Sequence, residues 1–575
     1  MNARRLWAPF ARTVELVAAE TRLPLHQDGK GWWSVEIDDL VARADYAFSI
    51  DGRDPIPDPR SPSQPKGVMG FSRPIDHSAY RWSDGGWCAP PLGSAVIYEC
   101  HIGTFTAGGT FDAAIDRLEY LKDLGISYLE LMPVAEFSGD CGWGYDGVDL
   151  YAPHHAYGGP DAMKRLVDAC HRIGLGVILD VVYNHLGPSG NFLPTLGPYL
   201  TDRYRTPWGN AINFDDSGSV EVRRLVCDNA LMWLRDYHAD GLRLDAVHAI
   251  FDASAIHVLE QLTTEVRALE AHLGRKFRLI AESDLNQPRL VTPVEAGGYG
   301  LDAQWSDDFH HAIHAYLTRE HSGYYADFGS LANVAKALAS PYVYDGIYSC
   351  HRNRVHGRTV GSLPADRFIV CIQNHDQIGN RAAGERLGHL ISVDRLKIAA
   401  ALLLTSPFVP LIFQGEEWNA SSPFQYFTDH RDPGLAQAVR EGRRREFGQF
   451  IGADAEVPDP QAWQTFARSK LKWEERELGE HIEMLAWYRK LIDYRCNRRP
   501  RPCLDQVKVD FDESAQWLRM SSGASEVVCN FAESKVSVPI APRDRVMRIV
   551  LASKKPVKVA PEKIVMPPIS IAILE

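Results

Sequence analysis

The chain has 575 residues, of which 45% are hydrophobic and 24% charged, and its 74 acidic and 62 basic residues give a net charge of −12. These values are ordinary for a soluble globular protein of three or four domains. The acidic balance lacks the basic face of a nucleic-acid-binding protein, and no run approaches the ~20 apolar residues of a membrane helix. We therefore expect neither nucleic acid nor a membrane as a partner.

Two further features of the sequence suggest the cellular compartment of the protein. The N-terminus has no apolar core of a signal peptide. The ten cysteines are scattered, without the spacing of a zinc ribbon, and they predict mostly buried, reduced thiols. Both features favour the cytoplasm.

The first part of the chain, residues 1–93, predicts a small β-sandwich. Short apolar or alternating runs are separated there by clusters of Gly, Asp and Pro. The runs are Val14–Val17, Trp32–Ile37 and Tyr46–Ile50. Asp54–Pro65 holds five prolines, too many for a strand interior, and we expect an irregular surface excursion there.

Residues 94–496 predict a (β/α)₈ TIM barrel with insertions, because short apolar runs alternate with amphipathic stretches. The predicted strands are Val96–Cys100, Tyr128–Met132, Val177–Val182, Gly241–Leu244, Arg278–Ala281, Asp302–Trp305, Phe368–Ile372 and Val409–Phe413. The predicted helices are Phe111–Asp123, Ala162–Ile173, Val220–Tyr237, Ser254–Leu273, Phe309–Arg319 and Val393–Leu404. A doubly wound open sheet is the competing fold, but no G-x-G-x-x-G follows the first strand.

The last part, residues 497–575, predicts a second β-sandwich, since strand-like runs return there. These runs are Val507–Phe511, Trp517–Ser521, Glu526–Phe531, Met547–Ala552 and Ile571–Leu574. The charged run Glu441–Glu446, before this domain, is typical of a solvated helix face.

Four of the predicted barrel strands end in polar residues. In a (β/α)₈ barrel the reactive side chains lie at the carboxyl ends of the strands, so Asp245, Glu282 and Asp376 are expected to converge on one mouth. A single Asp after a strand is more often a turn-former or helix cap. Four such strand ends in one barrel are harder to explain in that way.

Three neighbouring acids repel one another, which raises at least one pKa and supplies a proton donor at neutral pH. Glycoside hydrolysis needs this arrangement, with one carboxylate that attacks and one protonated carboxyl that serves the leaving oxygen. Arg243 lies two residues before Asp245 and faces the same side of the strand, where its cation would keep Asp245 ionised and aimed.

A metal-dependent hydrolase is the rival from a different class of chemistry. Such an enzyme often begins with an H-x-H pair on an early strand, and no H-x-H occurs in this chain. His310, His311 and His314 form an alternative ligand cluster, although their helical spacing is more typical of a helix face near the mouth. We expect no metal and no cofactor.

The strand ends carry the motifs DVVYNH, GLRLDAVH, LIAES and QNHDQ, in this order. They resemble the four signature regions of the α-amylase superfamily, glycoside hydrolase family 13. The resemblance implies a retaining enzyme with Asp245 as nucleophile, Glu282 as general acid/base and Asp376 as a stabiliser of the distorted sugar. The subsites around the cut would then be lined by Arg243, His185, His248 and His375, with Tyr145 stacked under the sugar, although a core aromatic is an equal interpretation of Tyr145.

Further motifs narrow the resemblance. YECHIGTFT, GWGYDG, SDDFHH and FQGEEW resemble the members of this superfamily that cut the α-1,4 bond next to the terminal trehalose of a maltooligosyltrehalose. The resemblance implies that substrate, free trehalose as product, and a trehalose pocket that draws on Asp307, Asp308, His310 and His311. Asp308 could equally cap a helix. A monomer or weak homodimer is expected.

Two alternatives stay open at this point. One is a branching or debranching activity on α-glucans within the same superfamily. The other is a non-catalytic glucan-binding protein on an inherited barrel, which typically loses the catalytic acids that are present here.

Overall fold

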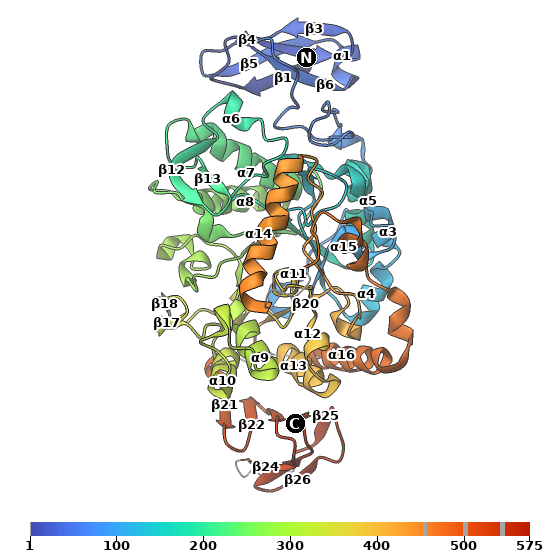
Figure 1. Ribbon diagram of the computed structural model, residues 1–575, viewed down its shortest axis with the longest axis vertical. Coiled ribbons are helices and arrows are strands. Elements are labelled where there is room, and N and C mark those ends of the chain that lie inside the picture. Colours follow the sequence, from blue (N-terminus) through green and yellow to red (C-terminus); the bar gives the residue numbers. More distant parts are fainter. Residues whose placement is uncertain (1, 452–456, 498–503, 541–546) are drawn as a thin grey trace.

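The centre of the molecule is a closed barrel of eight parallel strands. The computed structural model describes residues 2–451, 457–497, 504–540 and 547–575, and it places this barrel between two sheet domains at opposite ends (Figure 1). The barrel strands are β7 (Ile97–Cys100), β8 (Tyr128–Leu131), β11 (Gly176–Val181), β14 (Gly241–Leu244), β15 (Arg278–Ala281), β16 (Ala303–Trp305), β19 (Phe368–Cys371) and β20 (Val409–Phe413). They follow one another round the barrel in chain order, and β20 pairs with β7 to close it. All eight predicted strands and the predicted TIM barrel are confirmed.

The barrel interior changes from apolar to polar toward the carboxyl ends of the strands. Its lower part is a buried apolar cluster that includes Ile97, Tyr128, Ile178 and Ile280. Because alternate residues of a strand face the same side, the next inward positions are two residues further along. Those positions hold Glu99, Glu130, Asp180 and Glu282, and Arg243 stands opposite Asp180 in the register of β11 and β14. The strand register therefore gathers charge at one end of the barrel.

The barrel is covered by helices, most of which agree with the predicted ranges to within a few residues. They include α5 (Gly159–Arg172), α7 (Ser219–Arg235), α8 (Val258–Leu273), α9 (Asp307–Thr318) and α13 (Val393–Thr405). The predicted helix Phe111–Asp123 is wrong in one respect, since it is divided into α3 (Phe111–Ile115) and α4 (Leu118–Leu124). The break follows Asp116, and Arg117 at the start of α4 lies over the ring of Trp473 at 4.6 Å.

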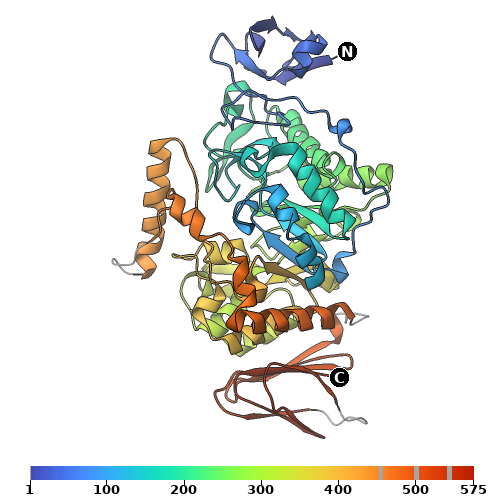
Figure 2. The same cartoon turned by 90° about the vertical axis from the view of Figure 1, so that its right-hand side faces the viewer.

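Outside this ring lie α10 (Leu331–Ala339), α14 (Pro433–Ile451), α15 (Trp463–Arg468) and α16 (Gly479–Asn497). Seen from the side, α14 projects away from the barrel body (Figure 2). The charged run 441–446 belongs to this helix, and its described side chains at 441–445 are exposed or partly exposed. Over those residues, the prediction of a solvated helix face is confirmed.

The N-terminal domain consists of two three-stranded antiparallel sheets, as predicted for a sandwich. One contains β1 (Asn2–Trp7), β5 (Trp32–Ile37) and β4 (His26–Gln27), and the other β3 (Thr21–Pro24), β2 (Val14–Ala18) and β6 (Tyr46–Ile50). The proline-rich segment 54–65 is irregular, but it is not merely a surface excursion. Asp58 is buried and accepts from Tyr46 Oη at 2.7 Å, while Arg60 pairs with Asp228 on α7 at 2.9 Å. The segment thus ties the domain to the barrel.

The C-terminal domain packs a five-stranded sheet against a three-stranded one. The larger contains β21 (Val507–Asp512), β22 (Trp517–Ser522), β23 (Ser525–Asn530), β28 (Ser570–Leu574) and β25 (Ile549–Ala552), and the smaller β24 (Val536–Pro539), β27 (Lys563–Met566) and β26 (Lys558–Ala560). The domain boundaries at 93/94 and 496/497 stay predictions. Most of the described cysteines are buried, and no described helix is long and apolar enough to cross a membrane.

Candidate active site

A fully buried arginine lies at the centre of the polar end of the barrel. Arg243 Nη1 lies 2.7 Å from Asp180 Oδ2 and 2.9 Å from Asp245 Oδ1, and its Nη2 lies 3.5 Å from Glu282 Oε2. The guanidinium also lies over the ring of Trp305 at 4.3 Å. A planar fork between three carboxylates fixes their relative positions, because its donors point in set directions.

Two of the predicted catalytic acids are brought together by this arginine. Asp245 accepts from Arg243 at one oxygen and from Asn184 Nδ2 at the other, at 3.0 Å. Glu282 accepts from the backbone N–H of Ala246, the residue after Asp245. Ala246 adopts φ +38°, a left-handed conformation that is uncommon for alanine and that aims this N–H at Glu282. Both carboxylates retain some exposure, 10% for the side chain of Asp245 and 14% for that of Glu282.

The third predicted acid, Asp376, lies on α11 (His375–Gly379) and is more open, with 37% of its side chain exposed. His375 beside it is fully buried, 2.6 Å from Glu99 Oε1 through Nδ1 and 2.7 Å from Tyr145 Oη through Nε2. Burial acts to lower the pKa of His375, but Asp376 and Glu99 outweigh it and raise the pKa to about 9. The imidazole is therefore charged at neutral pH and held between two acids.

The electrostatics of the cluster favour a protonated acid. Burial raises the pKa of Glu282 well above its ordinary range, Arg243 opposes this, and Asp245 and Asp376 add to it. Burial, with help from Asp376, also raises the pKa of Asp307 to about 7. Glu282 is therefore the carboxyl of the pair that is disfavoured as an anion, while Asp245 is held by two hydrogen-bond donors.

The remaining predicted sugar-lining residues surround these acids. Tyr145 donates from its hydroxyl to Asp180 Oδ2 at 2.6 Å and stacks on His375, with ring centroids 5.2 Å apart. His185 contacts Asn184 through Nδ1 and the backbone oxygen of Tyr145 through Nε2. His248 lies 3.9 Å from Asp284 and is 30% exposed. The hydrogen bonds of Tyr145 and His185 fix their part of the edge of the mouth.

Asp308 and His310 differ from this group because their polar atoms are occupied by the protein. Asp308 is buried and accepts at Oδ2 from Asn286 Nδ2 and from the backbone N–H groups of Val343 and Tyr344, at 2.7–2.8 Å. It does not cap α9, whose first residue is Asp307. Both ring nitrogens of His310 contact protein oxygens, those of Ile372 and Tyr325. These contacts anchor both side chains to the protein, and their place in a trehalose pocket stays a prediction.

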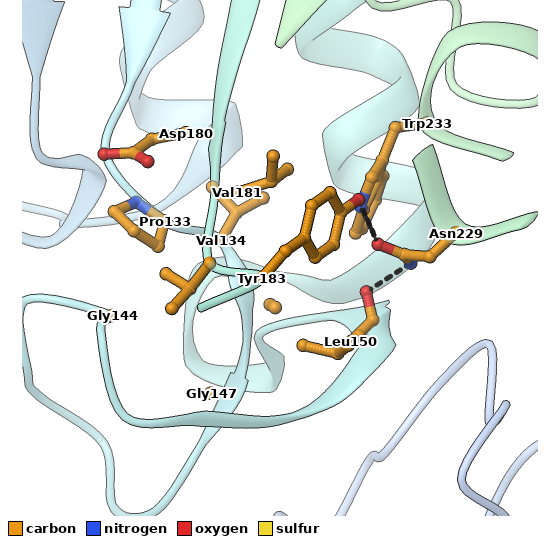
Figure 3. Close-up of a pocket in the computed structure, with 12 residues that line it drawn as sticks. Pro133, Val134, Gly144, Gly147, Leu150, Asp180, Val181, Tyr183, Asn229 and Trp233 are labelled. Atoms are coloured by element: carbon orange, nitrogen blue, oxygen red, sulfur yellow. Dashed lines mark hydrogen bonds between the residues drawn. The ribbon is translucent and has the colours of Figure 1, made fainter. Parts of the chain in front are cut away.

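A hydrogen-bonded support lies behind the end of β11 (Figure 3). Tyr183 donates to Asn229 Oδ1 at 2.6 Å, Trp233 Nε1 donates to the same oxygen at 3.1 Å, and Asn229 Nδ2 donates to the Leu150 oxygen at 2.8 Å. All four residues are buried. Because Tyr183 directly precedes Asn184, this network holds the segment that positions Asp245.

Two contributors to the site were not among the predicted site residues. Asp180 shares Arg243, and Glu99 holds His375. A signal for both exists, because a lone carboxylate inside a short apolar strand needs a buried partner. Asp307, predicted as part of the trehalose pocket, lies close enough to Asp376 for that charge to help raise the pKa of Asp307.

Comparison with known proteins extends this picture. A family model described as the α-amylase catalytic domain matches residues 69–195. The chain is 47% identical to a malto-oligosyltrehalose trehalohydrolase of Rhizobium sp. (strain M-11), over 99% of this chain and 97% of that protein. It is 49% identical to the protein of the same name from Arthrobacter ramosus, over 94% of each chain.

Among solved structures, a putative α-amylase from Salmonella typhimurium matches with a TM-score of 0.92 and 38% identity, over 100% of this chain and 97% of that one. Near-complete coverage means that the likeness includes the terminal sheet domains as well as the barrel. The chain belongs to the malto-oligosyltrehalose trehalohydrolase family, an α-amylase-type glycoside hydrolase family.

Proposed function

We propose that the chain hydrolyses the α-1,4-glucosidic bond next to the terminal trehalose of a maltooligosyltrehalose and releases free trehalose. The observation that carries the proposal is the pair of Asp245 and Glu282 on one buried guanidinium, in a chain that matches trehalohydrolases over nearly its whole length. The substrate is a neutral oligosaccharide, and the reaction needs no group beyond the side chains and water.

In the first step Asp245 attacks the anomeric carbon while Glu282 gives its proton to the departing glycosidic oxygen. The C–O bond to trehalose breaks as the Asp245–carbon bond forms. Arg243 and Asn184 support this role, since each donates to one oxygen of Asp245 and together they fix the orientation of its carboxyl group. The raised pKa of Glu282 supports its role as the acid.

In the second step Glu282, now a carboxylate, takes a proton from water, and the oxygen of that water displaces Asp245. The products are a shortened maltooligosaccharide and free trehalose, with one water consumed. Two displacements at one carbon retain its configuration. Asp376 is suited to stabilise the distorted sugar, because it is the most exposed of the three acids.

His185, His248, His375 and Tyr145 are proposed to line the sugar subsites. Hydrogen bonds to the protein fix the rings of His185, His375 and Tyr145, and His248 lies 3.9 Å from Asp284. A role in trehalose biosynthesis in the cytoplasm, as a monomer or weak homodimer, completes the proposal. It is supported by the trehalose product and by the cysteines of the described residues, most of which are buried.

The test is product analysis after incubation with a maltooligosyltrehalose and, separately, with amylose. Free trehalose from the first substrate, and a new reducing end that proton NMR shows first as the α-anomer, are the expected results. Asp245→Asn should abolish release, whereas Asp366→Asn, in the short turn before β19, should not. Transferred branches or cleavage of α-1,6 bonds would instead favour the branching or debranching alternative.

A further inference from the structure

A cluster of two histidines and two acids lies outside the catalytic cluster and has no part in the proposed reaction. Glu136 is on β9 (Ala135–Phe137), which pairs with β10 (Gly147–Pro153), and His154 and His155 directly follow β10. Side-chain atoms of these three residues lie within 4.8 Å of one another. The hairpin therefore brings together three groups that commonly bind transition metals.

His154 is the unusual member of the cluster. Its side chain is 0% exposed, yet neither ring nitrogen makes a hydrogen bond of normal geometry. Its Nδ1 lies 3.3 Å from Glu136 Oε1. By contrast, both ring nitrogens of the buried His310 have protein partners. A buried imidazole without a partner is costly, and it calls for a ligand.

The distances suit a tetrahedral ion. With metal–ligand bonds of about 2.0–2.1 Å, neighbouring ligand atoms of a tetrahedron lie about 3.3 Å apart. His154 Nδ1 and Glu136 Oε1 already have that separation. His155 Nδ1 is 2.7 Å from the same oxygen, a hydrogen-bond distance that opens by about half an ångström when a metal replaces the proton.

Two of the three side chains, Glu136 and His155, also make a second contact within the protein. Glu136 Oε2 accepts from the backbone N–H of His155 at 2.8 Å, which leaves Oε1 for an ion. Asp140 Oδ1 lies 3.2 Å from His155 Nε2, so that it can hold the ring proton there and leave Nδ1 as a lone pair. A carboxylate behind a ligating histidine is a common supporting arrangement at zinc sites.

We propose that Glu136, His154 and His155 form a zinc site, with Asp140 positioning His155 and water as the fourth ligand. Two imidazole nitrogens favour Zn²⁺ over Mg²⁺ or Ca²⁺, which prefer oxygen. An entry path exists, since 21% of the His155 side chain is exposed and a surface pocket lined by Gly67, Ser138 and Gly139 lies beside the cluster. The ion would link β9, which carries Glu136, to the two histidines that follow β10, at a site independent of the proposed reaction.

The test is zinc titration of the full chain, first freed of metal with a chelator, by calorimetry and by competition with a chromogenic zinc indicator. One zinc per chain and a raised melting temperature are expected. His155→Ala should abolish this binding, and Asp140→Asn should weaken it by about 10- to 100-fold. Glu136→Gln provides a second ligand variant, and His26→Ala, an exposed histidine of the N-terminal sheet, is the matched control. Absence of stoichiometric zinc, or zinc affinity unchanged in both ligand variants, would overturn the proposal.

Discussion

The buried pair of Glu99 and His375 makes a prediction that can be tested through stability. The pKa of His375 rises from 6.5 to about 9 because Asp376 and Glu99 outweigh burial. A difference of this size corresponds to about 3 kcal/mol. Since the folded pKa is raised, this stabilisation is fully present below pH 6.5 and is lost as the pH rises through about 9.

Glu99→Gln removes one of the two charges that raise the pKa of His375, and an opposite charge at hydrogen-bond distance accounts for about 1–3 pKa units. The variant should therefore lose about 1.4–4 kcal/mol of barrel stability at pH 6. The loss should become smaller between pH 8 and 10, where wild-type His375 also gives up its proton. Calorimetric melts across this pH range measure the difference.

Glu130→Gln is the matched control, because Glu130 stands opposite Glu99 in the register of β7 and β8. Burial raises its pKa well above the ordinary range, with a further contribution from Glu99, so Glu130 is disfavoured as an anion. Glu130→Gln should lower the free energy of unfolding only slightly, and this small loss should be the same at pH 6 and pH 8. A destabilisation by Glu99→Gln that is constant from pH 6 to 10 would refute the reasoning, since it would mean that His375 carries no charge.

Three further predictions follow from other parts of the structure. Asp307→Asn removes a negative charge that helps raise the pKa of Glu282, so the basic limb of the kcat/KM profile should move to lower pH by about 1 unit; an unmoved limb would contradict this. Asn229→Ala leaves three buried groups without their partner, each worth about 1–3 kcal/mol, and should lower the melting temperature by several degrees, where a loss under one degree would contradict it. Asp84 accepts a hydrogen bond from His171. Burial acts to raise the pKa of Asp84, but this contact outweighs it together with others and holds the pKa well below its ordinary value. Its stabilisation is present above about pH 4 and is lost as the pH falls, so the melting-temperature gap between wild type and Asp84→Asn should narrow in acid, and a widening gap would contradict this.

Much of the barrel was predictable because its strands are short apolar runs bounded by turns. Hydrophobic periodicity reports whether a segment is buried, and in a closed barrel this is enough to find each strand. It does not report what an irregular segment touches. The proline-rich stretch 54–65 shows this, because Arg60 reaches Asp228 far along the chain.

The site was partly predictable for the same reason. The rule that reactive groups follow the strands located Asp245, Glu282 and Asp376, whose proposed roles remain to be tested. The rule does not say which of two consecutive residues at the start of a helix faces the site, because successive side chains there point about 100° apart. Asp307 therefore faces Asp376 while Asp308 anchors Val343 and Tyr344.

The central claim is that Asp245 becomes covalently bound to the sugar. The most direct measurement uses Glu282→Gln with a maltooligosyl fluoride, because fluoride leaves without a proton donor while the second step lacks its base. Peptide mass spectrometry should find the maltooligosyl label on Asp245, and no label when Asp245→Asn is added. A label on another residue, or turnover to the β-anomer without any covalent species, would contradict the account.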